Sequence, residues 1–165
     1  MKVLFTYRSI TGNTRKIVQA MYDEIQADKE IKTFEETESL EGYDLTFVGF
    51  PIEGYGPGYA AENFLAQHVK GKRIVLVITH ASDEESALLQ DWLDLCRDAA
   101  EGAEIVGLFH CKGELSKQVA DVMLKSADPH LVVWAKMRDD TLGQPDASRI
   151  EKARMFAKKI MEKEA

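Results

Sequence analysis

Short apolar runs alternate along this chain with longer segments in which apolar residues recur every three or four positions. Five of the short runs predict strands, at residues 3–7, 31–34, 45–50, 74–79 and 105–110. Their nearly continuous apolar character is typical of strands that are covered by helices on both faces. The alternation of strand and helix predicts an α/β fold with a parallel sheet and right-handed crossovers.

The segments between the strands carry stripes of helical period, within residues 17–25, 64–65, 88–99, 115–123 and 150–161. We expect one helix from each stripe. No repeat, low-complexity tract or long linker interrupts the pattern. Residues 1–165 are therefore expected to form a single domain.

Smaller signals add detail to this pattern. Ser82 and Glu85 have the spacing of a capping box, and Pro145-Asp146 suits the start of the last helix. The stretch at about 111–144 is longer than a simple connection, and we interpret it as one extra helix followed by an irregular segment at 126–144. Trp92 and Trp134 are expected to pack in or near the core.

Charge and composition narrow the function classes. The 165 residues include 21 Lys or Arg and 28 Asp or Glu, which gives a formal net charge of −7. Nucleic acids and anionic membrane surfaces need a basic face, so neither is an expected partner. The N-terminal residues lack the pattern of a signal peptide, and Cys96 and Cys111 are too few for a disulfide framework. A reducing, cytoplasmic setting is the expectation.

The most informative segment follows the first strand and opens the first helix: Ser9-Ile10-Thr11-Gly12-Asn13-Thr14. Backbone N–H groups at a helix N-terminus favour an anion, and short hydroxyl side chains add donors without bulk. Gly12 allows a positive φ or a close approach to a ligand. The alternative is an ordinary polar turn in which Thr11 or Asn13 caps the helix and nothing binds.

Other phosphate-binding loops fit this segment poorly. The nucleoside-triphosphate loop needs a Lys after its second Gly, and the dinucleotide fingerprint needs three spaced glycines. Neither pattern is present. A low-molecular-weight tyrosine phosphatase would have a nucleophilic Cys in this turn, and a receiver domain would have acidic residues after the first and third strands. The chain has neither feature at these places.

The remaining pattern, Ser-x-Thr-Gly-x-Thr, resembles the FMN phosphate loop of the flavodoxin family at each position. Tyr43-Asp44-Leu45 before the third strand and Gly49-Phe50-Pro51 at its end are similar to the family as well. The resemblance implies a flavodoxin-like three-layer sandwich whose parallel sheet has the order 2-1-3-4-5. It also implies FMN as the cofactor, bound at the carboxyl ends of the strands.

Under this resemblance, a second loop lies against the flavin ring. It is rich in Gly and Pro, and its candidate residues are Pro51, Ile52, Gly54, Tyr55 and Gly56. Ile52 and Tyr55 are the candidates for apolar contact with the ring, and a peptide next to Gly54 or Gly56 can turn at little cost. The alternative is a plain connector with a surface Tyr.

A third loop, after the fourth strand, departs from the family. It lacks the stacking Tyr that many flavodoxins carry, and its candidates for hydrogen bonds to the ring are Thr79, Ala81 and Ser82. We expect His80 to face solvent rather than the ring. The resemblance therefore implies a ring that is held on one face only.

The function implied is that of an FMN-binding electron-transfer protein, a shuttle between a reductase and a redox partner. The acidic charge predicts partners with basic docking faces. One alternative is an NAD(P)H-dependent FMN or quinone reductase of the same fold, and another is a flavin-free interaction module. Residues 109–116 are also similar to a subgroup of short bacterial flavodoxin-like proteins, some of which assist larger reductases, including ones that act on bile pigments. This similarity implies a third alternative, an accessory flavoprotein.

Overall fold

The computed structural model describes residues 1–165 and contains one five-stranded parallel sheet. The strands are β1 (Lys2–Tyr7), β2 (Asp28–Thr33), β3 (Leu45–Pro51), β4 (Arg73–His80) and β5 (Glu104–Lys112). Their order in the sheet is β2-β1-β3-β4-β5, and every neighbouring pair is parallel. The predicted flavodoxin-like α/β sandwich and its strand order 2-1-3-4-5 are confirmed.

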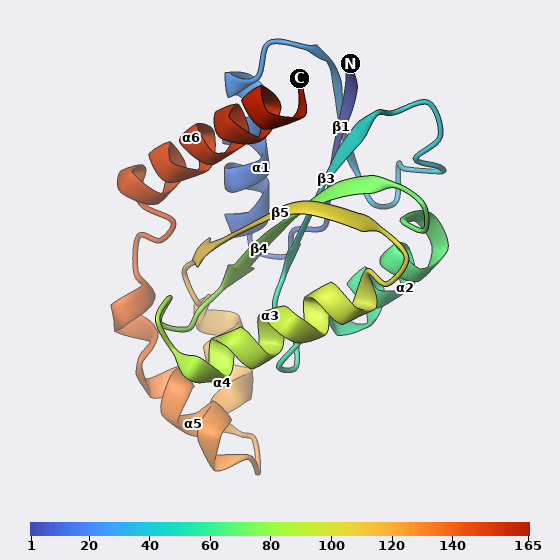
Figure 1. The fold of residues 1–165 in the computed structure, drawn as a ribbon. Helices are drawn as coiled ribbons and strands as arrows, with labels where there is room; N and C mark the ends of the chain where they lie inside the picture. The colour runs from blue at the N-terminus through green and yellow to red at the C-terminus, as the bar shows by residue number, and fades with distance from the viewer.

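Helices cover both faces of the sheet (Figure 1). They are α1 (Asn13–Glu24), α2 (Gly58–His68), α3 (Ala87–Ala99), α4 (Lys117–Leu124), α5 (Pro129–Lys136) and α6 (Ala147–Glu164), with a short 3-10 helix at Arg138–Thr141. One apolar cluster joins the sheet to α1 and α6, and a second joins it to α2 and α3. None of these helices combines the length and the apolarity that crossing a membrane requires.

The first helix lies very close to the sheet, and this positions the loop that precedes it. A Cβ on Gly49 of β3 would come within 2.6 Å of a Val18 methyl carbon and 3.1 Å of one on Thr14. Only a glycine leaves room for α1 at that point. The close contact fixes the N-terminus of α1 above the carboxyl ends of β1 and β3.

Two predicted boundaries differ from the structure. β2 begins three residues before the predicted run because it is an edge strand whose first residues are polar, and an apolar-run search does not detect such residues. The predicted capping box at Ser82 and Glu85 is wrong, since α3 begins at Ala87 and its N-cap is Ser86. Asp146 does cap α6, because its side chain accepts a hydrogen bond from the backbone N–H of Arg149.

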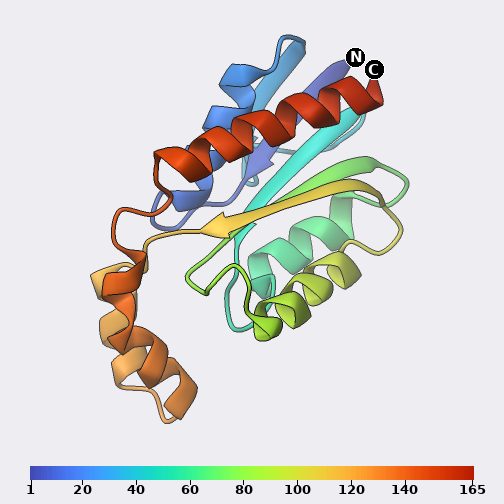
Figure 2. The ribbon, with the colours of Figure 1, turned by 60° about the vertical axis from the view of Figure 1, so that its left-hand side comes forward.

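The irregular segment predicted at 126–144 is also wrong. It contains α5, whose N-cap Asp128 accepts a hydrogen bond from the backbone N–H of His130, and the 3-10 helix. We call α4 and α5, residues 117–136, the arm. Its two helices pack mainly against each other and project from one end of the sheet (Figure 2). Only Ala120 and Ala135 of the arm are fully buried, so its sequence offers few core positions for recognising a helix.

Candidate functional site

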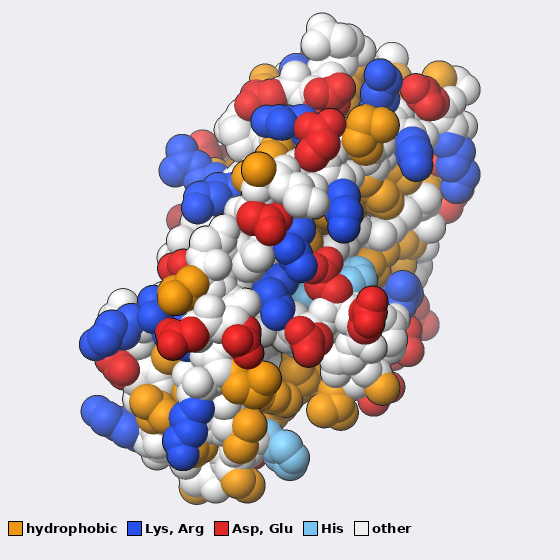
Figure 3. Space-filling model, turned by 90° about the vertical axis from the view of Figure 1, so that its left-hand side faces the viewer, with side chains coloured by type: hydrophobic (Ala, Val, Ile, Leu, Met, Phe, Trp, Pro, Cys, Tyr) orange, Lys and Arg blue, Asp and Glu red, His pale blue; other side chains and the backbone are white.

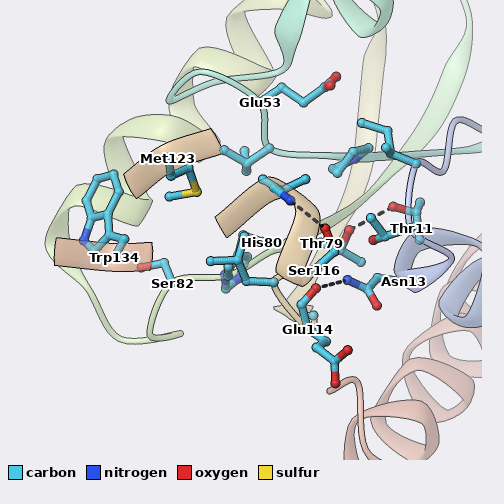
Figure 4. Close-up of a pocket in the computed structure, with 18 of the residues that line it drawn as sticks. Thr11, Asn13, Glu53, Thr79, His80, Ser82, Glu114, Ser116, Met123 and Trp134 are labelled. Carbon is cyan, nitrogen blue, oxygen red and sulfur yellow. Dashed lines mark hydrogen bonds between the residues drawn. The ribbon is translucent and has the colours of Figure 1, made fainter. Parts of the chain in front are cut away.

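A cavity of about 460 Å³ lies at the carboxyl ends of the central strands. The loops that follow β1, β3 and β4 form one side of it, as expected at the switch point of a doubly wound sheet. The arm and the segment that leads to it form the other side. Figure 4 shows Thr11 and Asn13 toward one end of the cavity, Trp134 and Met123 toward the other, and His80 between them.

The loop after β1 has the features of an anion-binding helix start. Gly12 is the N-cap of α1 and has a φ of 94°, so the predicted positive φ is confirmed. Ser9 Oγ accepts hydrogen bonds from the backbone N–H groups of Gly12 (3.1 Å) and Arg15 (3.3 Å). The N–H groups of Thr11, Asn13 and Thr14 donate to no protein acceptor. Neither Thr11 nor Asn13 caps the helix, since Gly12 is the N-cap and Ser9 supplies the side-chain acceptor for this turn.

Two hydrogen bonds fix this loop to its surroundings. Thr14 and Thr79 are both buried, and their hydroxyl oxygens lie 2.8 Å apart, which connects α1 to the end of β4. Asn13 Nδ2 donates to the backbone carbonyl of Glu114 at 2.9 Å, which connects the loop to the segment before the arm. Asn13 also packs so closely on Gly113 that a Cβ there would lie 2.5 Å from Nδ2. The loop is therefore held from two directions.

The loop after β3 contains a tight turn at residues 53–56. Glu53 and Gly56 exchange backbone hydrogen bonds of 2.8 and 3.3 Å. Gly54 and Tyr55 between them have φ values of 57° and 70°, as in a type I′ turn. Tyr55 is the one non-glycine residue of the chain with a positive φ. Such strained residues persist where the surrounding structure holds them, and they cluster at binding sites.

The surrounding structure that holds Tyr55 is an aromatic cluster. The ring centroid of Tyr55 lies 5.7 Å from that of Trp92 on α3 and 5.5 Å from that of Trp134 on α5, and the two indole centroids are 5.3 Å apart. The Tyr55 hydroxyl donates a hydrogen bond to the carboxylate of Asp128, which raises the pKa of Tyr55. Trp92 packs against the core, as predicted, and also lines the cavity. The prediction is wrong for Trp134, which is only partly buried and lies in the cavity wall away from both core clusters.

The loop after β4 contributes Thr79, Ala81 and Ser82 to the cavity wall, together with His80. The prediction that His80 faces solvent is wrong. Only 6% of His80 is exposed, and its Nε2 lies 3.0 Å from Nδ1 of His110 on β5. Burial is the main reason that the pKa of His80 falls to about 3, and the neighbouring His110 lowers it further.

The acidic residues around the cavity are largely paired. Glu53 lies 3.5 Å from Arg8, and Asp83 lies 3.2 Å from Lys112. Glu84 forms an ion pair with Arg149 at the start of α6. These pairs reduce the negative field around the cavity, and the Glu84–Arg149 pair connects the loop after β4 to the last helix.

The structure brings most of the predicted site residues to this one cavity. Those that line it are Ser9, Ile10, Thr11, Asn13, Thr14, Pro51, Ile52, Gly54, Tyr55, Thr79, Ala81 and Ser82. Gly12 and Gly56 do not line it. Gly12 supplies the positive φ that the loop needs. Gly56 closes the tight turn, and a Cβ at Gly56 would lie 3.6 Å from Cδ1 of Leu95 on α3.

Sequence reasoning missed the other side of the cavity. Apart from Trp92 and Trp134, the missed residues are Gly113, Glu114, Leu115, Ser116, Val119, Met123 and Leu131. They reach the site through the path of the chain after β5. The local signals were the similarity of residues 109–116 to short flavodoxin-like proteins, which assigned no role to these residues, and a helical stripe at 115–123.

Comparisons with known proteins agree with this geometry. A family model described as "Flavodoxin domain" matches residues 4–158. The "Flavodoxin-like domain-containing protein BilS" of Clostridioides difficile (strain CD3) is 30% identical, over 98% of this chain and 97% of the relative.

Two solved structures show the same fold at low identity. Oxidised flavodoxin 2 from Bacillus cereus has a TM-score of 0.63 and 19% identity, with 99% of both chains covered. A flavoprotein in complex with FMN from Lactobacillus acidophilus NCFM has a TM-score of 0.56 and 18% identity, with 66% of this chain and 92% of the other covered. The chain therefore belongs to the flavodoxin family.

Proposed function

We propose that this protein binds FMN in the cavity and carries electrons between a reductase and a redox partner. The observation that supports this most strongly is the convergence of three loops on one cavity. One loop offers free backbone N–H groups at a helix start, and another presents a strained aromatic residue. This arrangement suits a ligand with an anionic end and a flat apolar end.

The residues present fit FMN. The free N–H groups of Thr11, Asn13 and Thr14 and the exposed hydroxyl of Thr11 suit the phosphate, and the helix dipole of α1 adds to the attraction. Ile52, Tyr55 and the arm offer apolar surface for the ring. A cavity of about 460 Å³ falls within the range of roughly 300–1,000 Å³ that is usual for cofactor sites.

Bound FMN supplies the redox chemistry, and the chain binds and orients it. No cysteine is available for thiol chemistry, because Cys96 and Cys111 are buried and burial raises the pKa of each thiol to about 12. Free, buried thiols also suit a reducing, cytoplasmic setting.

The charge of the protein bears on its partners. A net charge of −7 and the cavity-lining carboxylate of Glu114, which forms no ion pair, favour partners with basic docking faces, and such association weakens as salt screens it.

A second candidate is a reductase, either one that uses NAD(P)H itself or an accessory flavoprotein of a larger enzyme. The observation that favours it is the arm, which carries exposed apolar side chains next to the cavity. Figure 3 shows hydrophobic side chains gathered at the end of the molecule from which the arm projects. Those on or next to the arm are Val119, Val122, Leu124, Val133, Met137 and Leu142. Of these, only Val119 lines the cavity, and the others form an exposed apolar surface that a partner enzyme would cover.

FMN titration tests the binding step. We expect added FMN fluorescence to be quenched at a stoichiometry of one, and Thr11→Asp to abolish this quenching by placing a carboxylate against the phosphate. Ser39→Asp is the matched control, since it adds the same charge at an exposed position remote from the cavity. Equal FMN binding by the two variants would overturn the phosphate-loop assignment.

Turnover separates the two candidate functions. The FMN-loaded protein is mixed with NADH or NADPH and a quinone, and nicotinamide absorbance is followed. A carrier oxidises neither nucleotide beyond a single equivalent, whereas sustained oxidation would make the protein a reductase.

A further inference from the structure

A pair of histidines joins the cavity to the edge strand of the sheet. His80 ends β4, His110 lies near the end of β5, and their ring nitrogens Nε2 and Nδ1 are 3.0 Å apart. Each histidine lies two positions after a residue that packs on the α3 side, Ile78 in β4 and Leu108 in β5, and residues two apart in a strand share a face. The pair therefore lies on the α3 side of the sheet, and none of the binding roles proposed above uses it.

The two ends of the pair have different surroundings. His80 lines the cavity and is 6% exposed. Its Nδ1 is sealed from solvent and makes no hydrogen bond of good geometry, although the backbone of Ser82 lies close enough to raise the pKa of the ring. His110 is only partly buried, and its Nε2 makes no hydrogen bond within the protein and is not sealed. A buried polar atom without a partner is costly, so a cavity ligand that bonds to His80 Nδ1 would remove that cost. The pair thus connects a sealed binding atom to an outer one.

Both rings are neutral at physiological pH. Burial is the first cause that lowers the pKa of each, to about 3 for His80. His110 lowers the pKa of His80 further, the backbone of Ser82 raises it, and the cations Lys112 on β5 and Arg149 on α6 lower it. For His110, the Glu84 carboxylate raises the pKa and Arg97 of α3 lowers it. Two neutral imidazoles share one hydrogen in the bond between them, so the pair has two tautomeric arrangements.

We propose that His80 and His110 form a proton relay between solvent and the cavity, with His80 exchanging a proton with a ring nitrogen or oxygen of bound FMN. The proposal rests on the proposed FMN function. His80 is then a catalytic residue that touches the cofactor, and His110 is a positioning residue that acts through it.

The relay balances for one proton in each direction. When electrons from the reductase arrive, the Nδ1 proton of His80 moves to the cofactor atom and the Nδ1 proton of His110 moves to His80 Nε2. A solvent proton then joins His110 Nε2. Both rings end neutral in the other tautomer. When the electrons leave for the redox partner, His80 Nδ1 would take the proton back and the sequence would reverse.

This cycle suits a carrier in particular. Reduction converts both rings to their second tautomer, and oxidation returns them to the first. Neither ring therefore has to rotate through a half-turn between cycles. Because the pKa of His80 is low, its ring does not remain protonated as an imidazolium in the cavity wall. Reduction therefore takes up a proton without placing a cation beside the ring.

Proton uptake during reduction tests the relay. The FMN-loaded protein is mixed in weak buffer with the methyl viologen radical cation, a reductant that releases no proton when it is oxidised, and flavin absorbance and a pH-indicator dye are followed together. In the native protein, we expect proton uptake to keep pace with flavin bleaching. In His110→Ala, uptake should lag at least tenfold while FMN affinity is unchanged, and added imidazole should restore the rate. His80→Gln should show the lag and also weaker FMN binding. His68→Gln on α2 is the control and should behave as the native protein.

The outcomes separate the two proposals. If the native protein binds no FMN, the proposed function fails and the relay fails with it. If all the proteins bind FMN and His110→Ala takes up protons at the native rate, the relay alone is overturned. A lag that imidazole does not restore also overturns it, since that result indicates a structural role for His110.

Discussion

Gly12 offers a clean test of how the phosphate loop depends on its backbone. Its φ of 94° lies in the region that L side chains rarely adopt, while a Cβ at this position would meet no atom within 4 Å. Gly12→Ala therefore adds backbone strain without a steric clash. The strain costs about 1–2 kcal/mol, and the less flexible unfolded chain offsets about 0.4–1 kcal/mol of it. We expect a net loss of about 1 kcal/mol, which lowers Tm by about 2–4 °C at this chain length.

The effect on FMN should be larger than the effect on stability. If the strained loop relaxes, at least one N–H group loses its alignment with the phosphate, and a hydrogen bond to a charged group contributes about 1.5–3 kcal/mol. We expect FMN to bind at least about tenfold more weakly, which corresponds to about 1.4 kcal/mol. Gly42→Ala is the control, because Gly42 has a φ of 85°, equally open space, and lies outside the cavity. Thermal melts and FMN fluorescence titrations measure both quantities. Equal FMN affinity in the two variants would refute the reasoning.

Three further predictions follow from the site. Thr14→Val and Thr79→Val should each lower the free energy of unfolding by about 1–3 kcal/mol, because each leaves the other buried hydroxyl unpaired. The double variant should lose less than the sum of the two, and additive losses in urea denaturation would contradict this. The chain has two tryptophans, Trp92 and Trp134, and both line the cavity, so FMN should quench tryptophan emission in the native protein and less in either Trp→Phe variant. The pKa of His80 falls from 6.5 to about 3 on folding, so its contribution to the free energy of unfolding is fully present above about pH 6.5 and is lost as the pH drops toward 3. We expect the free energy of unfolding to fall by about 2 kcal/mol between pH 7 and 5 because of this group, and His80→Gln to remove that part of the pH dependence in urea melts.

The fold was predictable because its signals are local. Buried strands such as 45–50 and 74–79 are continuous apolar runs, and the helical stripes between them have a clear period. The strand order came from the family resemblance rather than from any single residue. The prediction failed where burial is incomplete, at the polar start of edge strand β2 and at α5, which has one fully buried residue.

Half of the site was predictable for a similar reason. The phosphate loop is a contiguous motif, and Ser9 to Thr14 sit where a strand passes into a helix. The aromatic cluster is different, because Tyr55, Trp92 and Trp134 come from three separate elements and meet only in the folded chain. His80 was misjudged because its neighbour His110 lies 30 residues away on the next strand, diagonally across from it, in a register that pairs His110 with Ile78. Nothing local in the sequence distinguishes these contacts.

The way the arm is attached links its stability to the ligand. The arm buries only two residues fully. It is connected to the loop after β3 by the Tyr55–Asp128 hydrogen bond, and to that loop and α3 by the contacts of Trp134 with Tyr55 and Trp92. A cofactor that fills the cavity would add apolar contacts to the inner face of the arm, at Met123 and Leu131 for example. Regions with few buried contacts open locally at low free-energy cost, and a ligand that binds only the closed form stabilises them by mass action. Hydrogen exchange in the arm should therefore slow on FMN addition more than exchange in β3 or β4, which are buried in either state.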